Sequence, residues 1–197
     1  MSESGSFYGT LIDPVLRRMR IRVAKYVNPG QSVLDVACGT GAQIFEVAGK
    51  AGIAVGFDNS ESMIKRAHKI RERKKLMHTE FHIHNATEKW PYINNQFDVA
   101  ILSLALHQFS SDYYPAILNE MKRVAARHVF VDYAVPLPRN LTGAGAKVAE
   151  FLAGREHYKN FRNYNRLGGL SVILPNHVLI AENEEYFANN IFHLVFC

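Results

Sequence analysis

The stretch Val33–Gly41 (VLDVACGTG) constrains the fold of this chain more than any other segment. Its apolar first half has the composition of a buried strand, and its small residues predict a tight turn before a helix over Gln43–Lys50. Glycine at positions 39 and 41 allows the backbone to approach a ligand closely. Strand, glycine turn and helix in this order are typical of α/β sheets, which bind ligands at the carboxyl ends of their strands.

The following segments alternate in the same way between short apolar runs and helical patterns. This alternation predicts a Rossmann-like α/β fold with a doubly wound, mostly parallel sheet. Ser60 stands where an N-cap is expected, just before the second helix. Strands are expected at Ser32–Ala37, Ile53–Asp58, Glu80–Asn85, Phe97–Ala105 and His128–Ala134, and further helices at Glu61–Met77 and Asp112–Ala126.

The pattern changes after the fifth predicted strand. Two helical patterns follow a proline-containing break, and two later segments flank an Asn-Asn turn that favours an antiparallel strand pair. We therefore expect one domain over residues 1–197, with residues 137–170 as a helical cover inserted after the fifth strand. The predicted helices are Ala144–Arg155 and Glu156–Leu167, and the predicted strands are Val178–Ala188 and Asn190–Phe196.

Composition excludes several classes of protein. The 197 residues are 48% hydrophobic and 21% charged, which excludes an intrinsically disordered chain. No apolar run approaches the ~18 residues of a membrane span, and the first residues lack the apolar stretch of a signal peptide. Two cysteines, Cys38 and Cys197, provide neither a disulfide framework nor a four-ligand zinc site. We expect a cytoplasmic protein without a membrane span, as a monomer or a homodimer.

The formal net charge of +5 depends on Lys65–Lys75, which holds seven basic residues and one acidic residue and so contributes +6. A second basic cluster lies between Arg17 and Lys25. Basic patches of this kind can bind nucleic acid, but neither is interleaved with aromatic residues as a base-stacking surface would be. We therefore interpret both as solvated helix faces and expect no nucleic-acid partner.

The glycine turn does not match the phosphate-binding motifs. A dinucleotide motif requires a third glycine where Ile44 stands, and a P-loop requires a lysine after Gly41, where the chain has Ala42. Two acids flank the turn instead. Asp58, at the end of the second strand, can accept hydrogen bonds from ribose hydroxyls, and Asp35 suits a cationic group. S-adenosylmethionine, a nucleoside with a positive charge and no phosphates, satisfies both.

Three motifs, VLDVACGTG, GFDNSESM and FDVAILSLALH, resemble in order and spacing those of class I S-adenosylmethionine-dependent methyltransferases. The resemblance covers about Gln31–Tyr133, and it extends to the small-molecule group that includes the ubiquinone and menaquinone methyltransferases. It implies methyl transfer to a small, apolar or aromatic metabolite, with a carbon, oxygen or nitrogen acceptor left open. The cofactor-binding residues that it implies are Asp35, Ala37, Gly39, Gly41, Asp58, Asn59, Met63, Asn85, Ala86 and Ser103.

Candidates for the acceptor side lie after the fourth strand and in the cover. His107 stands where acceptor-side residues occur in this fold, and it is a candidate general base together with His157 and Tyr158, although a packed or hydrogen-bonded histidine is an equal alternative. The expected substrate-pocket residues are Tyr8, His157, Phe161 and Tyr164. The aromatic residues at positions 158, 161 and 164 have helical spacing, which is equally compatible with packing in the core.

No metal is expected as a cofactor. His82 and His84 are two residues apart in the third predicted strand, and no third ligand has a suitable spacing. A structural role for both histidines is therefore the interpretation.

Two alternative functions stay open at this point. The basic face of Lys65–Lys75 would suit a methyltransferase that acts on RNA or protein. Methyltransferases that act on the amino groups of nucleic-acid bases usually carry an Asn/Asp-Pro-Pro-aromatic motif after the fourth strand. This chain reads Ser103–His107 (SLALH) there, which counts against that activity. The cover of residues 137–170 is short, so a regulatory protein that binds the cofactor without turnover is the third possibility.

Overall fold

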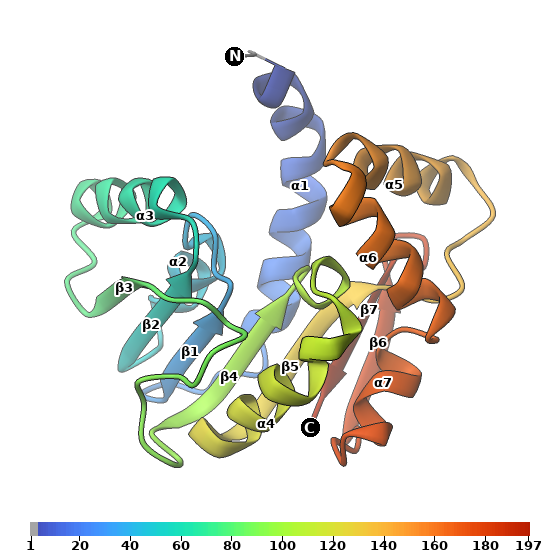
Figure 1. Ribbon diagram of the computed structural model, residues 1–197. Coiled ribbons are helices and arrows are strands. Elements are labelled where there is room, and N and C mark those ends of the chain that lie inside the picture. Colours follow the sequence, from blue (N-terminus) through green and yellow to red (C-terminus); the bar gives the residue numbers. More distant parts are fainter. Residues whose placement is uncertain (1–3) are drawn as a thin grey trace.

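The computed structural model describes the backbone of residues 4–197 and the side chains of residues 14–197. Its centre is a seven-stranded sheet with the order β3-β2-β1-β4-β5-β7-β6 (Figure 1). Neighbours among the first five strands are parallel, whereas β7 is antiparallel to β5 and β6, which confirms the predicted C-terminal pair. The strands are β1 (Ser32–Val36), β2 (Ile53–Asp58), β3 (Thr79–Ile83), β4 (Phe97–Ser103), β5 (Ala125–Tyr133), β6 (Asn183–Phe187) and β7 (Phe192–Phe196).

Helices cover both faces of the sheet, so the doubly wound arrangement is confirmed. Side chains alternate between the faces along each central strand. Leu34 and Val36 of β1 pack in the core that includes α4 and α7, whereas Val33 packs in the core that includes α1, α2 and α3. The helices are α1 (Ser4–Ala24), α2 (Ala42–Val47), α3 (Glu61–Lys74), α4 (Tyr114–Val124), α5 (Leu141–Leu152), α6 (Arg155–Arg166) and α7 (Leu170–Asn176), with short 3-10 turns η1 (Leu106–Gln108) and η2 (Ser111–Tyr113).

Local chemistry explains where helix α3 begins and ends. The hydroxyl of Ser60 accepts a hydrogen bond from the backbone N–H of Met63 at 3.4 Å, which confirms the predicted N-cap. The helix ends three residues before the predicted Met77, because Lys75 adopts a left-handed conformation with φ 56°. The exposed basic side chains of this helix include Lys65, Lys69 and Arg73.

The largest departures from the sequence prediction are two helices and the start of one strand. The sequence pattern does not predict helix α1, because basic residues interrupt its apolar positions and Pro14 lies inside it. Helix α7 has only seven residues and also contains a proline, Pro175, so its pattern is too short to stand out. The strand expected from Val178 begins at Asn183, because residues 178–182 form a turn and an irregular segment.

The helical cover after β5 is confirmed. Helices α5 and α6 stand beyond the carboxyl ends of β4 and β5, at the upper right of Figure 1. Helix α6 packs against η1, the turn that follows β4. The cover therefore meets the sheet at the edge where α/β proteins bind ligands.

Within residues 4–197, no helix combines the length and the apolar character that crossing a membrane requires.

Candidate functional site

The sheet changes its winding direction between β1 and β4. Strands β2 and β3 lie on one side of β1, and β4 and β5 lie on the other. Two residues at this switch point have positive φ although they carry side chains: Ala37 (φ 54°) follows β1, and Leu104 (φ 49°) follows β4. Strained backbone of this kind is concentrated at binding and catalytic sites. The switch point is therefore the first place to look for a ligand.

Asp58, the last residue of β2, is oriented by two backbone groups. Its Oδ2 atom accepts a hydrogen bond from the N–H of Gly39 at 2.9 Å, and its Oδ1 atom accepts one from the N–H of Ser60 at 2.8 Å. Each carboxylate oxygen keeps a lone pair for a further donor. Gly39 has φ 54°, and no atom lies within 4 Å of the position that a Cβ would take. The turn therefore presents its backbone and the Asp58 carboxylate to open space.

The second glycine of the turn has a different role. Gly41 has φ 78°, and a Cβ there would lie 2.5 Å from the ring of Phe81. This glycine is the N-cap of α2, and it permits the turn to pack against β3. It does not border either of the cavities described below.

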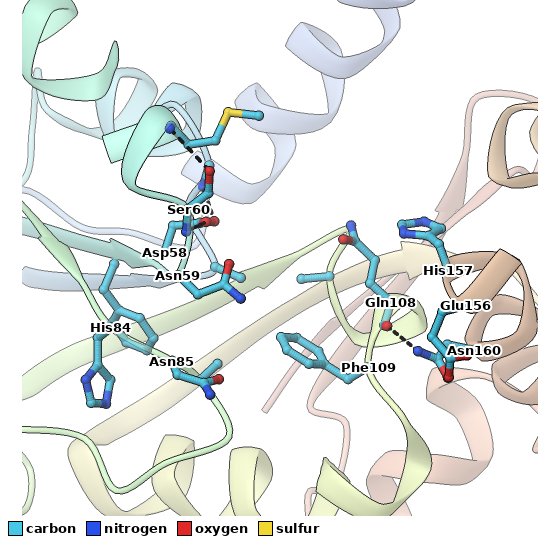
Figure 2. A pocket seen from close by; sticks show the side chains of 16 residues that line it. Asp58, Asn59, Ser60, His84, Asn85, Gln108, Phe109, Glu156, His157 and Asn160 are labelled. Atoms are coloured by element: carbon cyan, nitrogen blue, oxygen red, sulfur yellow. Dashed lines mark hydrogen bonds between the residues drawn. The ribbon is translucent and has the colours of Figure 1, made fainter. Parts of the chain in front are cut away.

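A cavity of about 580 Å³ opens at the switch point (Figure 2). Asp58, Asn59 and Asn85 lie on one wall, and Phe109 and His157 lie on the opposite wall. Predicted cofactor or substrate residues that border the cavity are Ala37, Gly39, Asp58, Asn59, Met63, Asn85, Ala86 and His157. Residues that sequence reasoning did not assign to it are Phe57, Ser60, His84, Ala105, Gln108, Phe109, Glu156 and Asn160.

The sequence positions of some of these unassigned residues indicate that they lie near the ligand-binding edge of the sheet. His84 directly follows β3, and Gln108 and Phe109 follow β4, so all three lie beyond carboxyl ends of parallel strands. The sequence gives no such indication for Asn160, because its position depends on how α6 docks. Its amide donates a hydrogen bond to the carbonyl of Gln108 at 2.7 Å, which ties the cover to the loop after β4.

Asn85 is fixed by its own turn. Its Oδ1 atom accepts hydrogen bonds from the N–H and the hydroxyl of Thr87, at 3.1 and 3.0 Å, and its Nδ2 atom donates to Glu88 at 3.2 Å. The carbonyl of the next residue, Ala86, accepts from the indole N–H of Trp90 at 3.0 Å. The loop after β3 thus forms a rigid rim of the cavity.

A smaller cavity of about 120 Å³ is bordered by two further predicted cofactor residues. It shares Ala37 with the larger cavity, and Asp35 and Ser103 border it together with Gln43. The Ser103 hydroxyl and the Gln43 Oε1 atom are buried, and neither has a hydrogen-bond partner in the part of the chain that the structure describes. Unpartnered buried polar atoms point to a polar ligand group.

Asp35 is buried, with only 2% of its surface exposed. Burial, and next the nearby Asp58 carboxylate, raise the pKa of Asp35 from the usual 3.8 to about 8. An acid in this state gains from any cation that enters the cavity, because the cation favours its charged form.

His107 lies behind the wall of the larger cavity, and only 2% of it is exposed. Its Nδ1 atom is 2.6 Å from Oδ1 of Asp132, and its backbone N–H donates to Oδ2 of the same residue at 3.1 Å. Its Nε2 atom lies 3.5 Å from a carboxylate oxygen of Glu150. Burial lowers the pKa of His107, but Asp132 and then Glu150 outweigh this effect and raise it to about 9.

Glu150 connects this buried histidine to the cavity. The same carboxylate oxygen contacts Nε2 of His157, which borders the cavity, and the other oxygen accepts a hydrogen bond from the hydroxyl of Tyr133 at 2.8 Å. Sequence reasoning missed both Glu150 and Asp132. Each is a single acid within an apolar segment, which is the same signal that singled out Asp35.

The predicted aromatic residues of the cover are not brought together at the cavity. Phe161 and Tyr164 are buried, and their rings pack at 6.0 and 6.3 Å from the His107 ring. Tyr158 borders a separate open groove along α6. Tyr8 belongs to α1, but its side chain lies outside the described residues. Among the predicted substrate-pocket residues with described side chains, His157 alone borders the larger cavity.

Comparisons with known proteins agree with this architecture. A family model described as a methyltransferase domain matches residues 33–128. A demethylmenaquinone methyltransferase from Alkalihalophilus pseudofirmus is 27% identical over 79% of this chain and 69% of its own length. One from Oceanobacillus iheyensis is 32% identical over 50% of this chain and 41% of its own length. The matched part of the chain covers between 41% and 69% of the length of these curated relatives.

Solved structures show the same fold. The crystal structure of a SAM-dependent methyltransferase from Aquifex aeolicus superimposes with a TM-score of 0.64 at 17% identity, over 93% of this chain and 87% of the other. Magnesium protoporphyrin IX methyltransferase from Synechocystis PCC 6803, with bound SAH, gives a TM-score of 0.61 at 17% identity, over 96% and 82%. At this level of sequence identity, the structural similarity establishes the fold alone.

Proposed function

We propose that this chain, which belongs to the class I S-adenosylmethionine-dependent methyltransferases, transfers the methyl group of that cofactor to a small, apolar or aromatic acceptor. The observation that carries the proposal is the carboxylate of Asp58, held by the glycine turn at the mouth of the switch-point cavity. Its free lone pairs suit the two hydroxyls of a ribose.

The residues present fit the rest of the cofactor. In this proposal Met63, Asn85 and Ala86, which all line the larger cavity, border the adenine. The amino-acid end reaches Asp35 and Ser103 in the smaller cavity, where buried polar atoms without partners support a polar occupant. Of the remaining residues of the implied cofactor set, Ala37, Gly39 and Asn59 border the larger cavity, whereas Gly41 supports the site indirectly by shaping the turn.

The cofactor supplies a methyl group that its sulfonium already activates, so the chain has two tasks. It has to align the acceptor with the methyl group, and it has to exclude water. Phe109 and Ala105 supply apolar wall at the acceptor end. His157 borders the same end, with Glu150 in contact behind it, and these groups are placed to take up a proton from an attacking hydroxyl or ring carbon. His107 is the next member of this chain of contacts, whereas Tyr158 faces the other groove.

The same wall and the relatives support the proposed acceptor class. Phe109 and Ala105 supply apolar surface beside the polar side chains of Gln108, His157 and Asn160, which suits an aromatic metabolite that carries polar groups. The two curated relatives above carry the name demethylmenaquinone methyltransferase, which supports a quinone-type ring with a carbon acceptor.

The test is a calorimetric titration with S-adenosylmethionine and S-adenosylhomocysteine, followed by a methyl-transfer assay on a panel of quinols and phenols. We expect micromolar binding that is lost in Asp58→Ala and kept in the exposed control Asp112→Ala. Absence of binding by the wild-type chain would overturn the proposal. Binding without turnover on any acceptor would favour the regulatory alternative.

A further inference from the structure

We propose that His107, Glu150 and His157 form a binding site for a divalent metal ion of the zinc class, at the acceptor end of the cavity. The three residues come from η1, α5 and α6, which the cover brings together. Their donor atoms all lie within 4.8 Å of one another. The chemical role of the ion rests on the proposed function. Its binding to the three residues does not depend on that function.

The donor set has the composition of a metal site. Two imidazoles and one carboxylate are a common three-ligand set for Zn²⁺ and for other divalent first-row metals. Two ligands about 2 Å from a tetrahedral ion are roughly 3.3 Å apart. The Nε2 atom of His107 lies 3.5 Å from Glu150, which matches two ligands of one ion better than a short hydrogen bond. The contact between His157 and Glu150 is closer than that of two ligands of one ion, so it would lengthen when the ion binds.

Neighbouring groups orient these ligands as they do in metal proteins. Asp132 engages the Nδ1 atom of His107 at 2.6 Å, which leaves Nε2 directed at the proposed ion. The hydroxyl of Tyr133 donates to one oxygen of Glu150, which leaves the other oxygen between the two imidazoles. Such carboxylate–histidine–metal arrangements fix the tautomer and the ring orientation of a ligand.

The charge of the cluster also calls for a cation. Asp132 and Glu150 are two carboxylates with 1% and 7% of their surfaces exposed. Across the described residues, neither is bonded to a lysine or an arginine. Metal ligation requires both imidazoles to be neutral, so the ion would take the place of any proton on His107, and the two carboxylates would then balance its two charges.

The ion would keep one position open towards the acceptor. Of the three ligands, His157 is the one that borders the cavity, so the proposed site adjoins the cavity at this residue. An acceptor hydroxyl that binds the ion through its oxygen loses its proton to water more readily, and the bound oxyanion makes either the oxygen or a conjugated ring carbon more nucleophilic. With the ion bound, His157 and Glu150 would act as ligands and not as proton acceptors. Methyl transfer to the activated atom would break the bond between the methyl group and the cofactor sulfur and release S-adenosylhomocysteine, and attack through a ring carbon would also release the proton of that carbon to water.

The experiment titrates the purified chain, free of affinity tags and stripped with a chelator, with Co²⁺ and with Zn²⁺. Visible absorption of Co²⁺ reports coordination, and calorimetry reports the affinity for Zn²⁺. We expect one ion per chain, with Co²⁺ bands typical of four or five ligands. Glu150→Gln and His157→Gln should each weaken binding at least ~10-fold. Asp132→Asn tests the positioning role of that residue and should weaken binding while the Co²⁺ bands persist at saturation.

The matched control is the exposed pair His82 and Glu80, whose side chains lie 3.4 Å apart on β3. His82→Gln should bind the metal as wild type does. Folding of each variant is checked by circular dichroism. Substoichiometric binding, or binding unchanged in Glu150→Gln and His157→Gln, would overturn the metal site. Titration of the metal-free chain with S-adenosylhomocysteine tests the proposed function separately, since Asp58 lies outside the metal cluster.

Discussion

The carboxylate of Asp58 accepts a hydrogen bond from the backbone N–H of Gly39 at 2.9 Å, although the two residues belong to different β-α units. This bond links the end of β2 to the glycine turn after β1. The same carboxylate therefore shapes the turn and offers its remaining lone pairs to a ligand.

Asp58→Asn separates these two roles. The amide oxygen retains one acceptor, but the charge and the second acceptor are lost. Loss of one hydrogen bond to a charged group corresponds to a roughly 10- to 100-fold weaker affinity for S-adenosylhomocysteine. Calorimetry should place Asp58→Asn between the wild type and Asp58→Ala. Equal affinity of Asp58→Asn and wild type would show that the carboxylate charge does not contribute to binding.

The raised pKa of Asp35 predicts a pH-dependent stability. Burial, and next Asp58, raise this pKa from 3.8 to about 8, so the folded chain holds a proton that the unfolded chain releases. The free energy of unfolding therefore falls as the pH rises from about 4 to about 8, and this loss is absent in Asp35→Asn. At pH 8 the variant should be more stable than wild type by at least ~1 kcal/mol. Urea unfolding of both proteins across this range measures the difference.

The raised pKa of Asp35 also predicts that the chain releases a proton when the cofactor binds. At neutral pH the ammonium group of the ligand would favour the charged form of Asp35, so binding should expel a proton. Titrations in buffers with different ionisation enthalpies detect it. Asp35→Asn should bind more weakly and release no proton. Identical proton release by wild type and variant would assign the effect to another group.

Gly41→Ala should destabilise the fold. The backbone there has φ 78°, and the new Cβ would lie 2.5 Å from the ring of Phe81. Strain and crowding together cost about 1–3 kcal/mol. Gly145→Ala, within α5 and with no atom within 4 Å of its Cβ position, is the matched control. It should raise stability by ~0.5–1 kcal/mol. Thermal or urea unfolding gives both values.

The basic face of α3 separates the small-molecule function from the RNA alternative. Lys69 and Arg73 are exposed on this helix, away from the lining of the cavity. The double charge reversal Lys69→Glu and Arg73→Glu should leave methyl transfer to a small acceptor within about twofold, because surface charges are screened. Salt-dependent RNA binding by wild type, lost in this variant together with activity on RNA, would favour the alternative.

Sequence by itself determined the doubly wound sheet and most of the proposed cofactor site. Its evidence was local: the apolar strand before Gly39, the acid that ends the second strand and the loop at Asn85 each belong to one contiguous motif. In parallel strands joined by helical crossovers, the carboxyl ends lie at the same edge of the sheet. The order of these motifs was therefore enough to bring Asp58, Asn85 and the glycine turn to one cavity.

Only the tertiary structure decided the acceptor side. The spacing of Phe161 and Tyr164 predicted that they share a helix face, but the docking of α6 on η1 turned that face into the core and His157 towards the cavity. The contacts of Glu150 with His107 and His157 likewise join three elements that no motif connects. Helix periodicity defines which residues lie on the same side, whereas the packing of one helix on another determines what that side meets.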